Sequence, residues 1–171
     1  HAKAEIKRLI DAYESLKKSG GIGSFNEDET CRKFILPLFH ALGWDTQGKE
    51  IIDEVTGQKI AGGQKRVDYS FNISGQPIMF LEAKQLSADL DDPQFARQAI
   101  NYGYGKTVKW VVLSDFEGII VFNALLKLKK ERISERTVLK LKHTEYLDKI
   151  DALWLLSKES FFSDKLNKYA Q

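Results

Sequence analysis

The spacing of apolar residues changes once along the chain, and this change constrains the fold more than any other feature. Before about residue 43, apolar residues such as Ile6, Leu9 and Tyr13 recur at intervals of three and four, which predicts amphipathic helices. From about residue 49, apolar and polar residues alternate, which predicts strands over 49–56, 66–73 and 77–84. A helix and two further strands, 110–114 and 118–122, follow. This order predicts an α/β (α+β) domain with a central mixed β-sheet flanked by helices.

Helix boundaries are marked by capping and breaking residues. The first helix is expected over 3–18, ending at Gly20. Asn26 and Glu29 have the spacing of a capping box and open a second helix that ends at Gly43. Pro37 lies inside that helix, so a kink or a tightened turn is expected there.

A third helix begins at Asp91-Asp92-Pro93, an acidic cap followed by a proline in the first turn, and runs to Gly103 or Gly105. Residues 125–143 fit either strands or a helix, and residues 146–162 have a helical pattern. We expect a single domain over 1–171, with a core at about 25–125 and a C-terminal extension or connector over 126–171.

Composition restricts the class of protein but does not identify a partner. Of the 171 residues, 43% are hydrophobic and 29% are charged, which indicates a globular domain. The sequence has no apolar run long enough for a membrane span and no apolar signal peptide, so a cytoplasmic location is expected. The single Cys31 cannot form an internal disulfide and is expected to be buried and inert. The net charge of +2 is too small to indicate nucleic acid binding by itself.

Two carboxylates and a lysine are predicted to meet on one face of the sheet. The alternation puts Asp68 on the face opposite Val67 and the other large apolar residues of its strand, and it puts Glu82 and Lys84 together on one face of the next strand. If Ser74-Gly75-Gln76 is a three-residue hairpin loop, Asp68 lies opposite Glu82.

Opposed carboxylates destabilise a sheet unless a cation lies between them or one of them is protonated. Mg²⁺ fits this position, because it accepts oxygen ligands from one or two carboxylates and takes water and phosphate oxygens at its other sites. Lys84 would reach the same place and could orient an attacking water or stabilise charge on a phosphate.

Two residues of the third helix extend this group. Gln98 and Tyr102 lie one turn apart on one face, where Gln98 could contact the water or a phosphate and Tyr102 could bridge to it. The alternative is a solvent-facing glutamine and a core tyrosine.

The set Asp68, Glu82-Ala83-Lys84 and Gln98-x-x-x-Tyr102 resembles the core of the PD-(D/E)xK nuclease superfamily, in the subgroup with a QxxxY helix. The segments NEDETCRKFILPLFHALGWD, RVDYSF, FLEAK, FARQAINYGY and WVVLSDFEGIIVFN resemble, in order, the N-terminal endonuclease domains of type IIG restriction-modification enzymes and the related N-terminal region of type I restriction subunits. The likeness spans roughly residues 5 to 160. Val67 replaces the proline of the motif name, a departure that is frequent in this superfamily.

The resemblance implies a role for each site residue. Asp68 and Glu82 would bind Mg²⁺, which Mn²⁺ could replace, together with the backbone carbonyl of Ala83, and Lys84 would serve the attacking water. Glu29 is a further candidate ligand, directly or through metal-bound water, although its capping position explains it equally well.

Other polar residues have simpler explanations. His40 is expected to be an ordinary helix residue and Asp115 a turn-forming residue, although the strand-end position of Asp115 could also suit function. Basic residues that could meet DNA phosphates are Lys65, Arg66, Arg97, Lys106 and the group Lys127, Lys129, Lys130, Arg132 and Arg136, although a solvated face explains that last group as well.

The resemblance therefore implies a Mg²⁺-dependent endonuclease that hydrolyses double-stranded DNA, in a longer protein with covalently linked methyltransferase and target-recognition domains. As an isolated domain it is expected to be monomeric and to cut poorly or without specificity. One alternative is a stand-alone repair or junction-resolving nuclease. Another is a catalytically silent DNA-binding module that has kept the fold.

Overall fold

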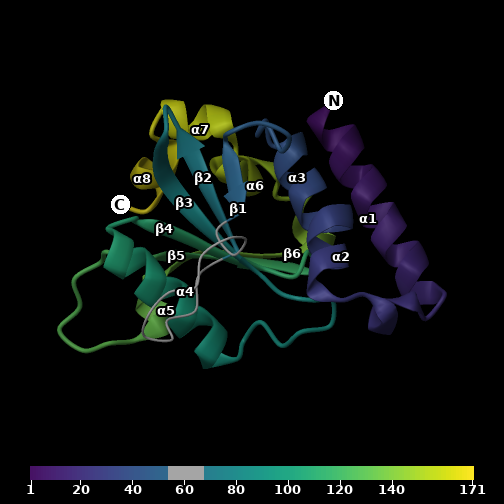
Figure 1. Ribbon diagram of the computed structural model, residues 1–171, viewed down its shortest axis with the longest axis horizontal. Coiled ribbons are helices and arrows are strands. Elements are labelled where there is room, and N and C mark those ends of the chain that lie inside the picture. Colours follow the sequence, from purple (N-terminus) through teal and green to yellow (C-terminus); the bar gives the residue numbers. More distant parts are fainter. Residues whose placement is uncertain (54–67) are drawn as a thin grey trace.

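The computed structural model describes residues 1–53 and 68–171 of the chain. A six-stranded mixed sheet flanked by helices confirms the predicted fold class (Figure 1). The strands lie side by side in chain order: β1 (Ile51–Asp53), β2 (Tyr69–Ile73), β3 (Gln76–Ala83), β4 (Trp110–Ser114), β5 (Gly118–Asn123) and β6 (Thr137–Lys142). The expected strands 49–56 and 66–73 each run partly outside the described residues.

Among the described strands, β3 and β4 run parallel, and every other neighbouring pair is antiparallel. A parallel pair needs a crossover connection, which α4 (Pro93–Lys106) provides. The predicted start of α4 is confirmed, since Asp92 is its N-cap and accepts a hydrogen bond from the Gln94 backbone N–H. The helix ends at Lys106, one residue beyond the predicted limit.

The loop between β2 and β3 is shorter than predicted. Ile73 pairs with Gln76, so the loop consists of Ser74 and Gly75 rather than three residues. Both have positive φ, 51° and 78°. This is the geometry of the two-residue turn whose twist matches that of the flanking strands.

A bulge in the ladder then restores the predicted alignment near the site. The register shifts once between β2 and β3, so that Tyr69 pairs with Leu81, as a three-residue loop would have placed them. The ladder of paired residues ends there, and the next residue, Asp68, still donates its backbone N–H to the Leu81 carbonyl at 3.1 Å. Asp68 therefore reaches the neighbourhood of Glu82 by a route that the sequence analysis did not predict.

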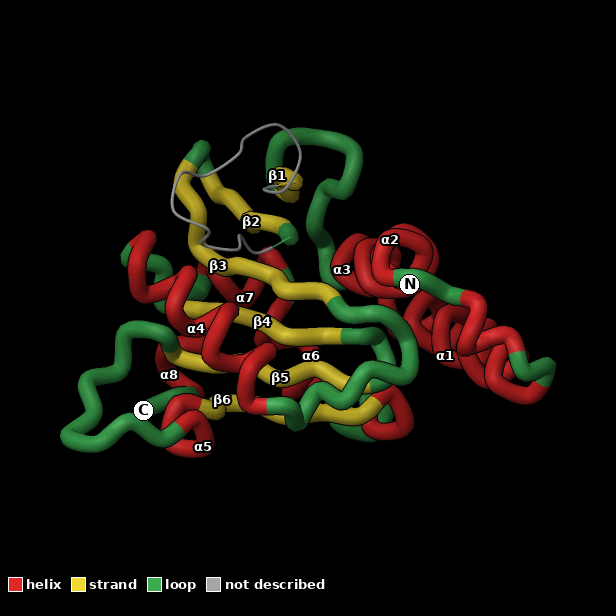
Figure 2. The backbone as a smooth tube through the Cα atoms, turned by 60° about the horizontal axis from the view of Figure 1, so that its bottom comes forward, coloured by secondary structure: helices red, strands yellow, loops and turns green. Residues whose placement is uncertain are grey.

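The two faces of the sheet carry different cores. The larger core packs one face against the N-terminal and C-terminal helices and includes Ile6, Tyr13, Phe39, Phe71, Leu81 and Leu153. The smaller core packs the other face against α4 and includes Phe80, Ala99, Ile100, Val111 and Phe122. Figure 2 shows α4 crossing in front of the sheet, with α5 (Ile133–Arg136) beside its lower edge. Glu82 has the parity of Phe80 and so belongs to the α4 face.

The N-terminal helices agree with the sequence except around Pro37. They comprise α1 (Ala2–Lys18), the 3₁₀ turn η1 (Gly21–Ser24), α2 (Glu27–Thr30), the π-helical segment η2 (Cys31–Ile35) and α3 (Leu36–Ala41). The irregularity expected at Pro37 lies just before it and is a widened π turn rather than a tightened one. A proline removes one backbone hydrogen bond, and a π segment changes which carbonyls are bonded.

The C-terminal part contributes to both the sheet and the core. Residues 125–143 contain both α5 and β6, and the helix expected over 146–162 is divided among short elements. These are α6 (Ile150–Leu153), η4 (Trp154–Leu156) and α7 (Lys158–Phe162), while η3 (His143–Glu145) precedes that range and α8 (Lys165–Tyr169) follows it. The larger core includes the buried residues Tyr146, Leu156 and Leu166. Among the described residues, no helix has the length and apolar character to span a membrane.

Candidate functional site

Asp68, Glu82 and Lys84 lie where the start of β2 meets the end of β3. The Ala83 backbone N–H donates a 2.7 Å hydrogen bond to Oδ2 of Asp68. Lys84 Nζ lies 3.0 Å from Oε1 of Glu82, and their side chains are only 7% and 1% exposed. The fold thus brings together the three residues that the sequence analysis selected.

Burial raises the pKa of Asp68 to about 7, and the nearby charge of Glu82 contributes the next largest upward effect. The Ala83 N–H and the Lys84 ammonium act in the opposite direction, because both stabilise the ionised carboxylate. The charge of Glu82 therefore acts on Asp68, as expected for carboxylates of neighbouring strands.

Lys84 has a second partner besides Glu82. Its Nζ lies over the ring of Phe95, 4.4 Å from the centroid, which is a cation–π distance. Its backbone N–H donates to the Ser114 carbonyl, so the chain just after β3 stays attached to β4. The ammonium is therefore held between a carboxylate and an aromatic face in a position largely shielded from water.

One side of α4, next to its buried face, carries the half-buried residues Phe95, Gln98 and Tyr102 at spacings of three and four. At one end Tyr102 stacks on Phe80, with centroids 4.9 Å apart, and at the other Phe95 contacts Lys84. Gln98 lies between them on the helix. The core role that the sequence allowed for Tyr102 is thus present.

Helix α2 places acidic residues near the same end of the sheet. Asn26 caps this helix by accepting the Glu29 backbone N–H at 2.8 Å, so the predicted capping residue is confirmed. The charge of Glu27 raises the pKa of Asp68. Buried Thr30 accepts the Leu86 backbone N–H at 3.2 Å, which attaches α2 to the segment after Lys84. Glu27 therefore joins Glu29 as an acidic candidate.

The residues present fit a hard divalent cation. No group of three or more His, Cys, Asp and Glu side chains suited to a metal occurs in residues 1–53 and 68–171. Mg²⁺ does not require one, since one or two carboxylates suffice when water and phosphate complete its shell. Asp68 and Glu82 supply two carboxylates whose mutual repulsion a cation would relieve, and the carbonyl of Ala83 belongs to the same strand end.

Asp115 follows β4 at the same end of the sheet and forms a turn. Its Oδ1 accepts the Gly118 backbone N–H at 2.9 Å, while Ser114 Oγ donates to the Gly118 carbonyl. The pKa of Asp115 is raised to about 7, mainly by burial and to a smaller extent by the charge of Glu117. The predicted turn role is confirmed.

Cys31 and His40 have the surroundings expected of structural residues. Cys31 is buried, and burial raises the pKa of its thiol far above its usual value. His40 is exposed in the last turn of α3. Neither residue adds a ligand to the carboxylate site.

The basic residues proposed for DNA contact divide into three groups. Lys65 and Arg66 lie outside the described residues. Arg97 and Lys106 are exposed on α4, as are Lys127, Lys129, Lys130 and Arg132 on the following segments. Arg136 does not fit the prediction of a solvated or DNA-contacting residue, because it is only 8% exposed. Its guanidinium donates to both carboxylate oxygens of Glu131 and to the carbonyls of Asn123, Ala124 and Leu126.

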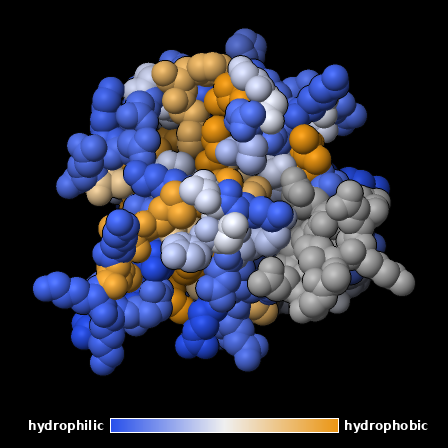
Figure 3. All heavy atoms as spheres, turned by 60° about the vertical axis from the view of Figure 1, so that its left-hand side comes forward, coloured by the Kyte–Doolittle hydropathy of each residue, from blue (hydrophilic) through white to orange (hydrophobic). Residues whose placement is uncertain are grey.

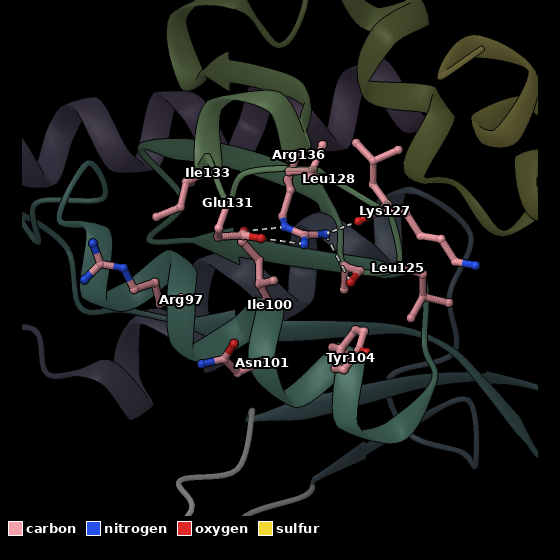
Figure 4. A pocket seen from close by; sticks show the side chains of 12 residues that line it. Arg97, Ile100, Asn101, Tyr104, Leu125, Lys127, Leu128, Glu131, Ile133 and Arg136 are labelled. Carbon is pink, nitrogen blue, oxygen red and sulfur yellow. Dashed lines mark hydrogen bonds and ion pairs between the residues drawn. The ribbon is translucent and has the colours of Figure 1, made fainter.

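A hollow of about 720 Å³ lies between α4, α5 and the segment joining β5 to α5. Figure 4 shows Arg97, Asn101 and Tyr104 of α4 on one side of it and the Arg136–Glu131 pair on the other. Figure 3 shows small apolar patches among mostly hydrophilic side chains on this side of the molecule. Asp68, Glu82 and Lys84 do not line the hollow, so it is separate from the carboxylate site.

Two residues of the site were missed by the sequence analysis. Phe95 precedes Gln98 by one helical turn, and this spacing could have added it to the face that carries Gln98 and Tyr102. Glu27 directly follows the N-cap Asn26, but its effect on Asp68 depends on how α2 packs beside β2, which no local pattern encodes.

Comparison with known proteins gives one informative match. The chain is 32% identical, over 174 aligned positions, to the type II restriction enzyme and methyltransferase RM.Eco57I of Escherichia coli. The alignment covers 94% of this chain but only 17% of that protein. No protein-family model matches the chain, and no solved structure matches it significantly. The chain is therefore related to a restriction-modification enzyme through a segment much shorter than that enzyme.

Proposed function

We propose that this domain is a Mg²⁺-dependent DNA endonuclease of the PD-(D/E)xK type, acting as the cleavage part of a type IIG-like restriction-modification protein. One observation carries the proposal: Asp68, Glu82 and Lys84 converge at one end of the sheet, with Glu82 and Lys84 almost fully buried as an ion pair. Burying charges is costly, and perturbed carboxylates beside a lysine are typical of catalytic sites.

The restriction-modification context rests on the relative. Its name describes one protein that is both a restriction enzyme and a methyltransferase, and the chain matches 17% of its length. We infer that this domain acts on double-stranded DNA and is covalently linked to methyltransferase and target-recognition domains in a cytoplasmic protein. Alone, it should be monomeric and bind DNA weakly through exposed residues such as Arg97, Lys106 and Lys127.

Each site residue has a proposed role. Asp68 and Glu82, with the carbonyl of Ala83, hold Mg²⁺ or Mn²⁺. When bound, the cation supplies the charge that activates water and polarises a phosphate. The Ala83 N–H fixes the orientation of the Asp68 carboxylate by its 2.7 Å hydrogen bond. Lys84 orients the attacking water or stabilises charge on the scissile phosphate.

The surrounding residues support this arrangement. Gln98, one helical turn before Tyr102 on α4, contacts the water or a phosphate, and Tyr102 keeps α4 packed on β3 through Phe80. Glu27 and Glu29 are candidates for an additional ligand, acting directly or through metal-bound water.

Nicking of supercoiled plasmid tests the proposal. With Mn²⁺ or Mg²⁺, the wild-type domain should convert the plasmid to the open form, and EDTA should abolish the reaction. Lys84→Ala should reduce the rate by roughly 100-fold or more, since an interaction that stabilises transition-state charge is lost. Lys149→Ala is a matched control, because Lys149 is an exposed lysine paired with Glu145 far along the chain.

Nicking should be unchanged in Lys149→Ala. Nicking that persists in EDTA, or equal rates in the wild type and Lys84→Ala, would contradict the assignment.

A further inference from the structure

We propose that Phe95 is a positioning residue for Lys84: its ring keeps the Lys84 ammonium in the site when Glu82 binds a metal ion. This inference rests on the proposed function, since it concerns the lysine assigned to the attacking water. It assigns to the start of α4 a role that neither Gln98 nor Tyr102 provides.

Lys84 is shared between two partners of different kinds. Its Nζ is 3.0 Å from Oε1 of Glu82 and 4.4 Å from the centroid of the Phe95 ring. The side chain is only 7% exposed, so water replaces neither partner easily. A cation–π contact shielded from water favours the ammonium in the site over the ammonium in solvent by roughly 30-fold, which is enough to hold a flexible lysine.

The two partners respond differently to a divalent cation. A cation that binds Glu82 neutralises the carboxylate that now attracts Lys84, and it also repels the ammonium. Lysine has a flexible four-carbon stem, so without another partner its ammonium would leave for solvent. The Phe95 ring keeps its attraction for the ammonium because it binds no metal. Phe95 therefore holds Lys84 at the site in the state in which Lys84 is needed.

The ring is fixed well enough for this task. Phe95 is the third residue of α4, whose start is set by the Asp92 cap and by Pro93. The preceding loop is attached to β6 by the ion pair between Asp91 and Lys140, with a 2.6 Å N–O distance. The Phe95 side chain also packs against the smaller core. The ring is therefore positioned by its own helix start and by the core, independently of Lys84.

Two substitutions separate the ring face from simple packing. Phe95→Tyr keeps an aromatic face, whereas Phe95→Leu keeps an apolar side chain without one. Ile133→Ala is the control, because Ile133 packs against the same core from α5 and lines the hollow instead of contacting Lys84. Each variant is made in the wild type and in a Lys84→Met background.

The first readout is the thermal unfolding midpoint without metal. Phe95→Leu should lower the midpoint by roughly 2 to 5 °C more when Lys84 is present than in the Lys84→Met background. Ile133→Ala should lower it equally in both, because loss of packing does not depend on Lys84. Equal effects of Phe95→Leu in both backgrounds would overturn the proposal.

The second readout is Mn²⁺-dependent plasmid nicking. Phe95→Leu should slow nicking about tenfold, and never more than Lys84→Met does, while Phe95→Tyr should stay within about threefold of the wild type. Ile133→Ala should nick as the wild type does. A Phe95→Tyr variant as slow as Phe95→Leu would overturn the role of the ring face. A wild type that does not nick at all would overturn the proposed function and, with it, this assignment.

Discussion

Asp68 and Asp115 lie at the same end of the sheet, and both have a pKa raised to about 7, mainly by burial. Their surroundings differ. Asp115 lies in a turn where backbone N–H groups, including that of Gly118, bond to its carboxylate, and the next acidic residue, Glu117, accepts a hydrogen bond from Tyr13. Asp68 instead shares its position with Glu82 and Lys84.

The comparison shows that a perturbed pKa alone does not identify a site. The carboxylate of Asp115 accepts hydrogen bonds within its own turn, and its bond from the Gly118 N–H holds the connection between β4 and β5. A nearby carboxylate raises the pKa of each residue, Glu117 for Asp115 and Glu82 for Asp68. Glu82, however, comes from a neighbouring strand and is buried beside Lys84. Convergence of unlike groups from separate strands distinguishes the candidate site from the turn.

The largest expected difference between the two regions is in activity. Asp68→Asn and Glu82→Gln should each reduce metal-dependent nicking by roughly 1000-fold, because a neutral amide is a poor ligand for a hard cation. Asp115→Asn should stay within about twofold of the wild type, since an amide oxygen can still accept the Gly118 N–H. If Asp115→Asn were as inactive as Asp68→Asn, the difference between the candidate site and the structural turn would be contradicted.

In contrast to activity, the pH dependence of stability should be similar for Asp68 and Asp115. A carboxyl whose folded pKa is raised stabilises the fold below its unfolded pKa, and this contribution is lost as pH rises through about 7. Without metal at pH 8, Asp68→Asn and Asp115→Asn should each be more stable than the wild type, by about 2 kcal/mol, with a smaller gain at pH 5.

Denaturant unfolding in EDTA at pH 5 and pH 8 measures these gains, and the double variant should show the weakest pH dependence. A gain at pH 8 no larger than that at pH 5, for either single variant, would contradict the burial argument for that residue.

The smallest expected effect concerns the acidic residues of α2. Glu27→Gln should lower the pKa of Asp68 slightly, because the charge of Glu27 raises it. The pH at which the protein loses this part of its stability should then be lower by a few tenths of a pH unit. Glu29→Gln is the matched control on the same helix, and NMR titration of Asp68 in both variants provides the measurement. An equal or larger shift in Glu29→Gln would favour Glu29 as the acidic neighbour.

The sequence predicted the elements whose patterns are local. The apolar spacing of α1, the Asp92-Pro93 start of α4 and the alternation in β3 each depend on a few neighbouring residues. The convergence of Asp68 with Glu82 was also predicted, although from a three-residue loop. A two-residue turn followed by a bulge gives the same pairing at Tyr69 and Leu81 as a three-residue loop, so the alignment near Asp68 did not depend on the loop length.

The sequence could not predict what depends on packing between distant segments. The stretch 146–162 has a helical pattern, but it is divided among short helices that fit around Trp44 and the larger core. Arg136 belongs to a run of basic residues that suggests a solvated face, yet it is buried by carbonyls brought together in the fold. Phe95 and Glu27 acquire their relation to the site only when α4 and α2 pack beside the sheet.

Calorimetric titration of Mn²⁺ is the direct test of whether Asp68 and Glu82 form a metal site. Four proteins are needed: the wild type, Asp68→Ala, Glu82→Ala and, as the buried-carboxylate control, Asp115→Asn. The wild type and Asp115→Asn should bind Mn²⁺ and the other two variants should not, and metal-dependent nicking should follow the same pattern. Equal Mn²⁺ binding by all four proteins would contradict the assignment of the metal site.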